Sequence, residues 1–257
     1  MNCKICHKES VLFDSGRIMN KYTIQYFRCV HCGFIQTEEP YWLHEAYAHA
    51  INECDVGIVQ RNIRFARSSR LVLNSFFDPN GRFLDYGAGS GLFVRLMRDT
   101  GFDFYGMDKY TPGVFARSFA VEPDSREQFD LVTAFEVFEH MVQPLEDFET
   151  ILRFSKNVLF STLLVPEPAP KPGTWWYFGM NHGQHISFYT LDALRCLAAD
   201  RSLYLTSDGG MLHLFSERPI SPWMFRLLVR NRVSKILDSL LSRAPLTETD
   251  HQNILKK

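Results

Sequence analysis

The sequence predicts an α/β protein with a mostly parallel sheet, preceded by a small cysteine-rich module. Three observations support this prediction. A glycine-rich turn joins an apolar strand to an amphipathic helix within residues 82–99, strand and helix patterns then alternate as far as residue 216, and two CxxC pairs occupy the first 40 residues. With 257 residues and a hydrophobic fraction of 46%, the chain can bury one large domain and a small appendage.

Residues 1–40 are predicted to form a zinc ribbon. Each CxxC pair places two thiolates on one tight turn, and two such turns supply a tetrahedral four-sulfur site suited to zinc, with iron as the rival metal. The closed shell predicts a structural role, in a core separate from the main domain. Alternating apolar residues and a Ser-Gly turn between the pairs predict a short hairpin, and Gly33 is expected to have a positive φ. The four ligands are Cys3, Cys6, Cys29 and Cys32.

The remaining cysteines and the histidines beside the ribbon are not expected to bind metal. His7 and His31 adjoin a shell that four thiolates already fill, and Cys54 and Cys196 stand alone, as ordinary buried residues do. Residues 41–80 are predicted to be a connecting segment followed by a long helix that starts near Gly57.

Residues 81–216 are predicted to form a cofactor-binding core. A buried strand at 82–86 leads into the glycines at 87, 89 and 91, and a helix continues from residue 92. A strand, a glycine turn and a helix N-terminus together let a cofactor approach the backbone. The third glycine comes one residue too early for a dinucleotide fingerprint, which disfavours a nicotinamide oxidoreductase. Asp108 ends the second strand, where an acid can accept hydrogen bonds from ribose hydroxyls.

The later elements of this core follow in order. We expect a third strand near residues 114–123, a fourth strand and a helix start within 129–141, and a fifth strand at 157–166. A helix is predicted at 190–200 and a hairpin at 203–217.

The segments LDYGAGSG, GMDKY and FDLVTAFEVFEH resemble successive motifs of the class I S-adenosylmethionine-dependent methyltransferases, over residues 60–216. The resemblance implies a Rossmann-like, seven-stranded sheet with a reversed final hairpin. A cysteine-paired segment before such a domain resembles sugar-modifying bacterial methyltransferases. The cofactor contacts that the resemblance implies are Asp85, Gly87, Ala88, Gly89, Gly91, Asp108, Lys109, Phe135 and Glu136.

Two carboxylates and a histidine follow the fourth strand. Glu136, Glu139 and His140 are spaced i, i+3, i+4, so one helical turn would bring them to one face at the carboxyl end of the sheet. His182 and His185 follow the fifth strand.

This pattern resembles two metal-dependent subgroups, the ubiquinone-pathway O-methyltransferases and the small-RNA 3′-terminal 2′-O-methyltransferases. It implies a magnesium or manganese site at Glu136, Glu139, His140 and His185. The alternative is that Glu136 and His140 line the cofactor pocket while Glu139 is solvated. His140, His185 and Glu136 are the candidate catalytic residues in either case.

The predicted activity is methyl transfer from S-adenosylmethionine to a small molecule, at a hydroxyl of a sugar or a glycosylated metabolite. Residues 175–178 (WWYF) would stack on a ring or act as a structural lid. An RNA-modifying enzyme that grips the strand with the ribbon and the tail is the alternative. The net charge of −1 counts against it. The intact glycine loop counts against a non-catalytic binding module.

Residues 217–257 are predicted to be a basic helical tail. Residues 218–257 contain eight Lys or Arg against three Asp or Glu. Such a tail can touch an acidic partner or a membrane surface, or simply be a solvated helix face. No apolar run approaches the length of a membrane span, and the N-terminus has a metal-site pattern in place of a secretory signal. A cytoplasmic location is therefore expected.

Overall fold

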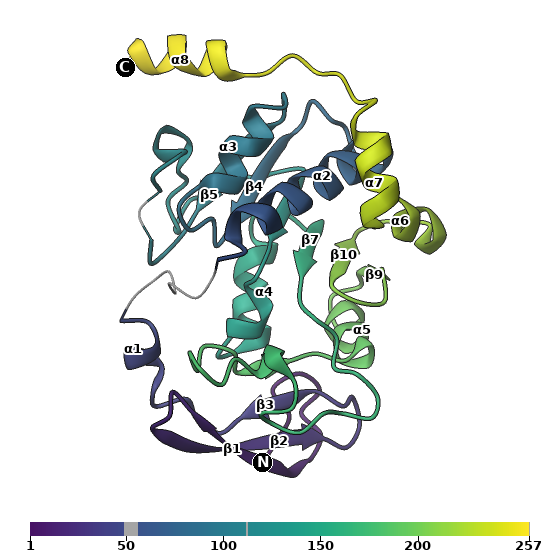
Figure 1. The fold of residues 1–257 in the computed structure, drawn as a ribbon. Coiled ribbons are helices and arrows are strands. Elements are labelled where there is room, and N and C mark those ends of the chain that lie inside the picture. Colours follow the sequence, from purple (N-terminus) through teal and green to yellow (C-terminus); the bar gives the residue numbers. More distant parts are fainter. Residues whose placement is uncertain (49–55, 112, 257) are drawn as a thin grey trace.

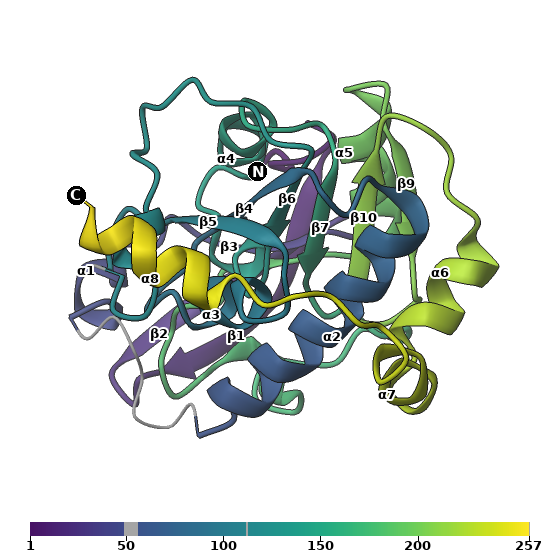
Figure 2. The same ribbon diagram turned by 90° about the horizontal axis from the view of Figure 1, so that it is seen from above.

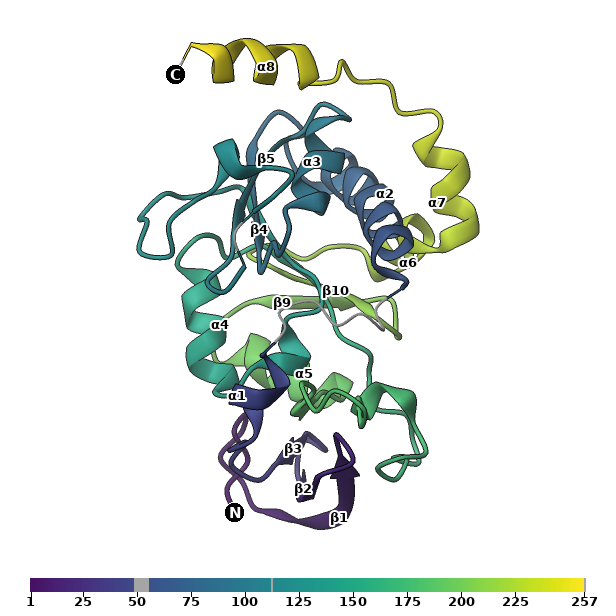
Figure 3. The ribbon, with the colours of Figure 1, turned by 60° about the vertical axis from the view of Figure 1, so that its left-hand side comes forward.

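The computed structural model describes residues 1–48, 56–111 and 113–256. The N-terminal ribbon lies at one end of the molecule, the main sheet in the middle and the last helix at the opposite end (Figures 1 and 3). Cys54 lies outside the described residues. Among those residues, no helix is long and apolar enough to cross a membrane.

The main sheet confirms the α/β prediction. Its strand order is β5-β4-β6-β7-β10-β9, with β5, β4, β6 and β7 parallel and β10 antiparallel to both neighbours. The carboxyl ends of the four parallel strands therefore meet at one edge, where the candidate site residues follow. The strands are β4 (Arg82–Tyr86), β5 (Asp103–Met107), β6 (Leu131–Ala134), β7 (Val158–Ser161), β9 (Tyr204–Ser207) and β10 (Leu212–Ser216).

Helices cover both faces of this sheet (Figure 2). On one face, α2 (Ile58–Phe76) and α3 (Leu92–Arg98) bury an apolar core against β4 and β5. On the other, α4 (Pro144–Leu152) and α5 (Leu191–Ala199) enclose a second core. The long helix begins directly after Gly57, as predicted.

The sheet has six strands within the described residues where seven were expected. In the predicted third strand, residues 114–123, one parallel bridge joins Gly106 to Ala120, and the Val121 N–H donates to the Gly106 carbonyl (2.8 Å). A 3₁₀ turn, Arg117–Phe119, occupies the rest. Val114 and Phe115 are both exposed, so the segment lacks the alternating burial that holds a strand in register.

A second sheet builds the ribbon. Its order is β1-β2-β3-β8, from β1 (Ser10–Ile18), β2 (Tyr22–Cys29), β3 (Ile35–Thr37) and β8 (Ser187–Phe188). The hairpin turn lies at Met19 and Asn20, which have φ values of 52° and 55°. The predicted Ser-Gly turn is wrong, because Ser15 and Gly16 lie inside β1 and pair with β2.

The ribbon shares its core with the main domain and is not separate from it. β3 pairs with β8, which belongs to the segment after β7. Phe34 packs on Tyr189 with ring centroids 5.0 Å apart. Cys29 and Cys32 lie in the same buried cluster as Phe138. A short helix, α1 (Leu43–Ala46), then leads out of the ribbon.

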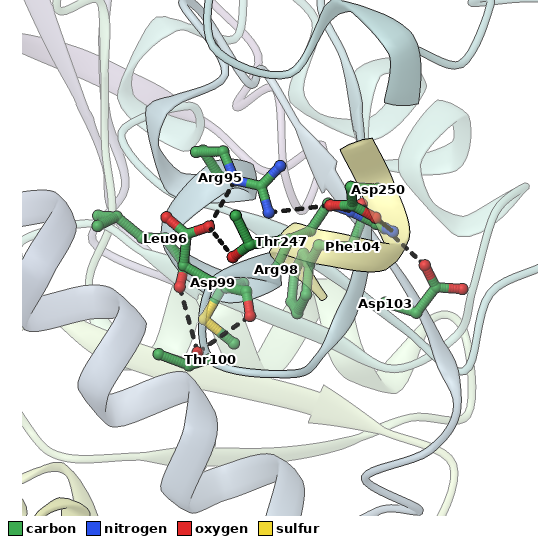
Figure 4. Close-up of polar contacts among 10 residues, drawn as sticks. Arg95, Leu96, Arg98, Asp99, Thr100, Asp103, Phe104, Thr247 and Asp250 are labelled. Atoms are coloured by element: carbon green, nitrogen blue, oxygen red, sulfur yellow. Dashed lines mark hydrogen bonds and ion pairs between the residues drawn. The ribbon is translucent and has the colours of Figure 1, made fainter. Parts of the chain in front are cut away.

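Three helices end the chain: α6 (Pro222–Val229), α7 (Asn231–Asp238) and α8 (Thr247–Leu255). The buried Asp250 fastens α8 to α3 (Figure 4). Arg98 donates from Nε (2.9 Å) and Nη2 (2.6 Å) to the two oxygens of Asp250, and Arg95 adds a third bond of 2.9 Å. Because every other α8 side chain up to Leu255 is exposed, this carboxylate is the main attachment of the helix.

We expect Asp250→Asn to detach α8, since an amide has a single acceptor oxygen and no charge for Arg95 and Arg98, and Arg98 keeps its other carboxylate partner, Asp103, without the helix. The free energy of unfolding should fall by about 1–3 kcal/mol, less than for a fully enclosed pair because water can reach Arg98 once the helix leaves. Hydrogen exchange should accelerate in residues 247–255. Glu248→Gln, on an exposed position of the same helix, is the control. Unchanged exchange in Asp250→Asn would mean that other contacts hold the tail.

Candidate functional site

The four ribbon cysteines lie at the spacing of a metal site. Their Sγ atoms are 3.7 Å apart for Cys3 and Cys32, 3.6 Å for Cys6 and Cys32, and 3.5 Å for Cys6 and Cys29. Tetrahedral zinc with bonds of about 2.3 Å separates its sulfurs by about 3.8 Å. These distances exclude disulfides, whose sulfurs are about 2 Å apart. The cluster could therefore bind zinc.

Local backbone geometry supports the same cluster. The N–H groups of Ile5 and His31 donate to the sulfurs of Cys3 and Cys29, each at 3.4 Å. Such bonds stabilise thiolates. Gly33 has a φ of 71°, as predicted. His7 and His31 are exposed and lie outside the four-cysteine group.

The glycine loop leaves space where a cofactor could approach. Gly87, Gly89 and Gly91 have φ values of 75°, 52° and 79°, which side chains rarely tolerate. A Cβ at Gly87 would meet Val137 at 2.7 Å, whereas a Cβ at Gly89 would meet nothing within 4 Å. The N–H groups of Gly87 and Ala88 donate to the Met107 carbonyl. Beside the loop is a cavity of about 150 Å³, lined in part by Gly89 and Asp108.

Two carboxylates flank this loop in different environments. Asp85 is 4% exposed and accepts one hydrogen bond, from Thr133 (2.7 Å). Burial raises the pKa of Asp85 to about 7, and the charge of Asp108 adds to the shift. Asp108 accepts three backbone bonds, from Gly89 (2.8 Å) and from the two residues after Lys109. Asp108 therefore braces the loop and keeps about one lone-pair position for a ribose hydroxyl. Lys109 is exposed.

Phe135 and Glu136 follow β6. The Phe135 ring stacks on Phe65 of α2 with centroids 4.3 Å apart. The Glu136 N–H donates to the Ser161 hydroxyl (2.8 Å), which in turn donates to Oε1 of Glu136 (2.7 Å). Oε2 of Glu136 lies 3.5 Å from Nε of Arg61.

The predicted single helical turn through Glu136, Glu139 and His140 is wrong. Glu136 has a left-handed φ of 55°, a strained conformation for a side chain. A 3₁₀ turn at Phe138–His140 follows, and α4 begins only at Pro144. The Glu136 carboxylate instead contacts Ser161 and Arg61. Ligand atoms of Glu139, His140 and His185 lie within 4.8 Å of one another, and Glu136 is not in this group.

Backbone carbonyls set the hydrogen positions of the two histidines. Nδ1 of His185 lies 2.6 Å from the Tyr177 carbonyl oxygen, and Nδ1 of His140 lies 3.1 Å from that of Gln184. A carbonyl only accepts, so each Nδ1 carries hydrogen and each Nε2 keeps its lone pair. Burial lowers the pKa of His140 to about 4 and that of His185 well below its usual value. Both rings are therefore neutral, as metal ligands must be.

The Glu139 carboxylate makes no hydrogen bond of normal geometry among the described residues, although the Tyr177 hydroxyl and the N–H of Glu139 itself are near enough to oppose part of the rise in its pKa. The residue is 0% exposed, and neither of its oxygens is bonded within the described part of the chain. Burial raises the pKa of this carboxyl strongly, and the charge of Glu136 adds to the effect. Burying an ionised carboxylate unpaired costs several kcal/mol. A solvated Glu139, one of the two sequence-based alternatives, is therefore wrong.

The sequence patterns did not identify Tyr47 or Gln184, which hold His140. The Tyr47 hydroxyl lies 3.0 Å from its Nδ1. Neither residue belongs to a spaced motif, so only the tertiary fold shows them. In the aromatic segment, Tyr177 and Phe178 are buried and Trp176 is 72% exposed. Two of the four aromatic residues at 175–178 therefore pack in the core and are not available to stack on a ring.

Comparisons with known proteins agree with this fold. A family model described as a methyltransferase domain matches residues 59–207. An O-methyltransferase family protein from Burkholderia thailandensis has a similar structure, with a TM-score of 0.52, 10% identity, and coverage of 72% of this chain and 65% of that one. The plantazolicin methyltransferase BpumL, in complex with a monoazolic desmethylPZN analog and SAH, has a TM-score of 0.51 and 14% identity, covering 76% and 86%. We found no significant sequence match to a curated protein.

The fold and the glycine loop thus define an S-adenosylmethionine-dependent methyltransferase. The matched segment includes more than half of the sequence, so the chain belongs to the methyltransferase-domain family.

Proposed function

We propose that this enzyme transfers a methyl group from S-adenosylmethionine to a hydroxyl of a small molecule that a divalent ion helps to bind. The supporting observation is the buried Glu139 carboxylate, which makes no hydrogen bond of normal geometry among the described residues, in one group with His140 and His185, whose Nδ1 atoms donate to carbonyls and leave the Nε2 lone pairs for a ligand. One carboxylate and two imidazoles would hold an ion and leave open positions for acceptor oxygens.

The donor set narrows the choice of ion. Magnesium prefers oxygen ligands, whereas manganese also accepts imidazole. With Glu136 bonded to Ser161 and Arg61, two of the three clustered donors are nitrogens. We therefore favour manganese over magnesium, and we assign Glu136 to the rim of the cofactor pocket.

The chain's own residues would align the two reactants. The Asp85 carboxylate would bind the ammonium group of the cofactor, and Asp108 would hold its ribose. The open space beside Gly89 would admit the methionine part of the cofactor. The acceptor oxygen then attacks the methyl carbon as the carbon–sulfur bond breaks and its electron pair passes to sulfur. A bound ion would lower the pKa of the acceptor hydroxyl, so that its proton passes to solvent as the oxygen is methylated.

Direct proton removal by His140 is the metal-free alternative. It is the weaker hypothesis, since an imidazole with a pKa of about 4 is a poor base for a hydroxyl.

Open coordination positions on such an ion would favour one class of acceptor. Two neighbouring hydroxyls can occupy adjacent positions on one ion, as in a sugar. We therefore propose a sugar or glycosylated metabolite as the acceptor, with the exposed Trp176 available to stack on its ring.

The metal hypothesis predicts that manganese stabilises the protein through Glu139. At about 100 times its dissociation constant, a ligand adds about 2.7 kcal/mol to the free energy of unfolding, which raises Tm by several degrees. Glu139→Gln should abolish this shift and the methyl transfer, while the metal-free variant should be about as stable as the metal-free parent, because the raised pKa of Glu139 keeps that carboxyl protonated without metal and Gln has the same charge and a similar shape. Differential scanning calorimetry measures both effects.

Glu146→Gln, on an exposed position of α4, is the matched control and should keep the manganese shift. His185→Ala should behave like Glu139→Gln, and the double variant should lose little more activity, because the ligands act together. Full activity after EDTA treatment, combined with its loss in His140→Ala, would refute the metal and support His140 as the base.

Cofactor affinity should weaken as the pH falls from 7 to 6. Asp85 has a raised pKa of about 7, so below that value the carboxyl is protonated and cannot pair with the cofactor ammonium. The dissociation constant of S-adenosylmethionine should rise about fivefold over that unit, as the ionised fraction of Asp85 falls. Isothermal titration calorimetry measures it. Asp85→Asn should bind weakly and without this pH dependence, and a parent protein that binds equally at both pH values would contradict the role of Asp85.

The ribbon should purify with one zinc ion per chain. Cys29→Ser should lose zinc, and because β3 pairs with β8 it should also weaken manganese binding at His185. Elemental analysis and manganese titration measure the two effects. Cys196→Ser, outside the cluster, is the control. Iron in place of zinc, or a Cys3–Cys6 disulfide, would contradict the zinc ribbon.

A further inference from the structure

Helices α6 and α7 and the turn after them present large apolar side chains to solvent. Trp223 is 72% exposed, Ile236 is 66% exposed and Leu240 is 75% exposed. The core does not need them, since Phe225 and Leu228 already bury the underside of α6. These three side chains therefore expose apolar surface that the packing of the domain does not explain.

The charged residues around them are of one sign. Arg226, Arg230, Arg232 and Lys235 are exposed, and no Asp or Glu occurs between residues 218 and 237. The first acid, Asp238, faces inward. Its side chain is 13% exposed and forms ion pairs with Arg70 and Arg67 of α2.

The apolar and cationic side chains share helix faces. On α7 and its following turn, residues 232, 236 and 240 are four apart, with Lys235 beside them. On α6, Trp223 and Arg226 are three apart, and Arg230 is the extended residue that joins α6 to α7. The two helices lie next to each other at the outer edge of the main domain, away from the ribbon (Figures 1 and 3). We call these seven side chains the α6–α7 surface.

We propose that the α6–α7 surface docks on an anionic lipid surface, with both helices lying in the interface. Basic amphipathic helices with Trp and aliphatic residues bind such surfaces through apolar insertion together with attraction to acidic headgroups. RNA would attract the arginines and could stack on Trp223. It would leave Ile236 and Leu240 with nothing apolar to bury against, so lipid fits the whole surface better. This docking is independent of the proposed methyl acceptor.

Vesicle co-sedimentation of the full chain tests the proposal. The protein should bind vesicles of phosphatidylglycerol mixed with phosphatidylcholine, should bind far less to phosphatidylcholine alone, and should dissociate as salt screens the cations. Trp223→Ser and Leu240→Ser should each lower the partition coefficient about tenfold. Arg232→Glu should lower it at low salt. All these side chains are exposed, so melting temperature and cofactor binding should stay unchanged.

Matched controls distinguish binding through the α6–α7 surface from non-specific binding of the protein to vesicles. Leu12→Ser removes an exposed aliphatic side chain (59%) on the ribbon, and Lys156→Glu makes the same charge reversal elsewhere. Both should bind vesicles like the parent. Three results would overturn the proposal: no binding to anionic vesicles, equal loss in the controls, or binding to a single-stranded RNA oligonucleotide that Trp223→Ser and Arg232→Glu abolish while vesicles stay unbound. The last result would make the surface a nucleic-acid site.

Discussion

The 3₁₀ turn that buries Glu139 depends on one segment, residues 186–189, that packs along it. The Ile186 N–H donates to the Glu139 carbonyl (2.9 Å), the Ser187 hydroxyl to that of Met141 (2.8 Å), and the Tyr189 hydroxyl to that of Phe138 (3.1 Å). The same segment contains β8, which pairs with β3 of the ribbon. The four cysteines are thus connected to the candidate metal ligands through hydrogen bonds of the backbone and of the Ser187 and Tyr189 hydroxyls. A structural metal in the ribbon would therefore help to fix the positions of Glu139, His140 and His185 in the main domain.

Local sequence signals were sufficient for the parts of the fold that depend on spacing. The glycine loop, the paired cysteines and the long helix after Gly57 each follow from residues close together in the chain. Signals of that kind contain no information about the left-handed φ of Glu136, which removes it from the helical face that its spacing implied. They also could not show that a two-residue strand, β8, would join the ribbon to the domain. Such features arise from tertiary contacts.

Exposure also could not be predicted from residue type alone. The sequence offers four consecutive aromatic residues at 175–178, yet the fold buries Tyr177 and Phe178 and exposes Trp176. Trp223 had no motif to mark it, although it is as exposed as Trp176. Whether an aromatic residue is buried or exposed depends on which side of its turn or helix faces the core, and the residue type does not specify that side. The tail's net positive charge was visible in the sequence, whereas the inward direction of Asp238 required the structure.

Three buried carboxylates show how their surroundings assign their roles. Asp250 accepts bonds from two arginines, so its charge is neutralised within the chain and it acts as a fastener for α8. Asp85 accepts one bond from a neutral donor, Thr133, so its charge is only partly compensated. A cation that approaches it would compensate the rest. Glu139 makes no hydrogen bond of normal geometry within the described part of the chain. The fewer hydrogen bonds and opposite charges surround a buried carboxylate, the more its ionised form costs. Asp250 should therefore attract nothing further, Asp85 a singly charged ammonium group, and Glu139 a divalent ion. The same ordering follows the sheet from its amino edge to its carboxyl edge, where the cofactor and the acceptor would meet.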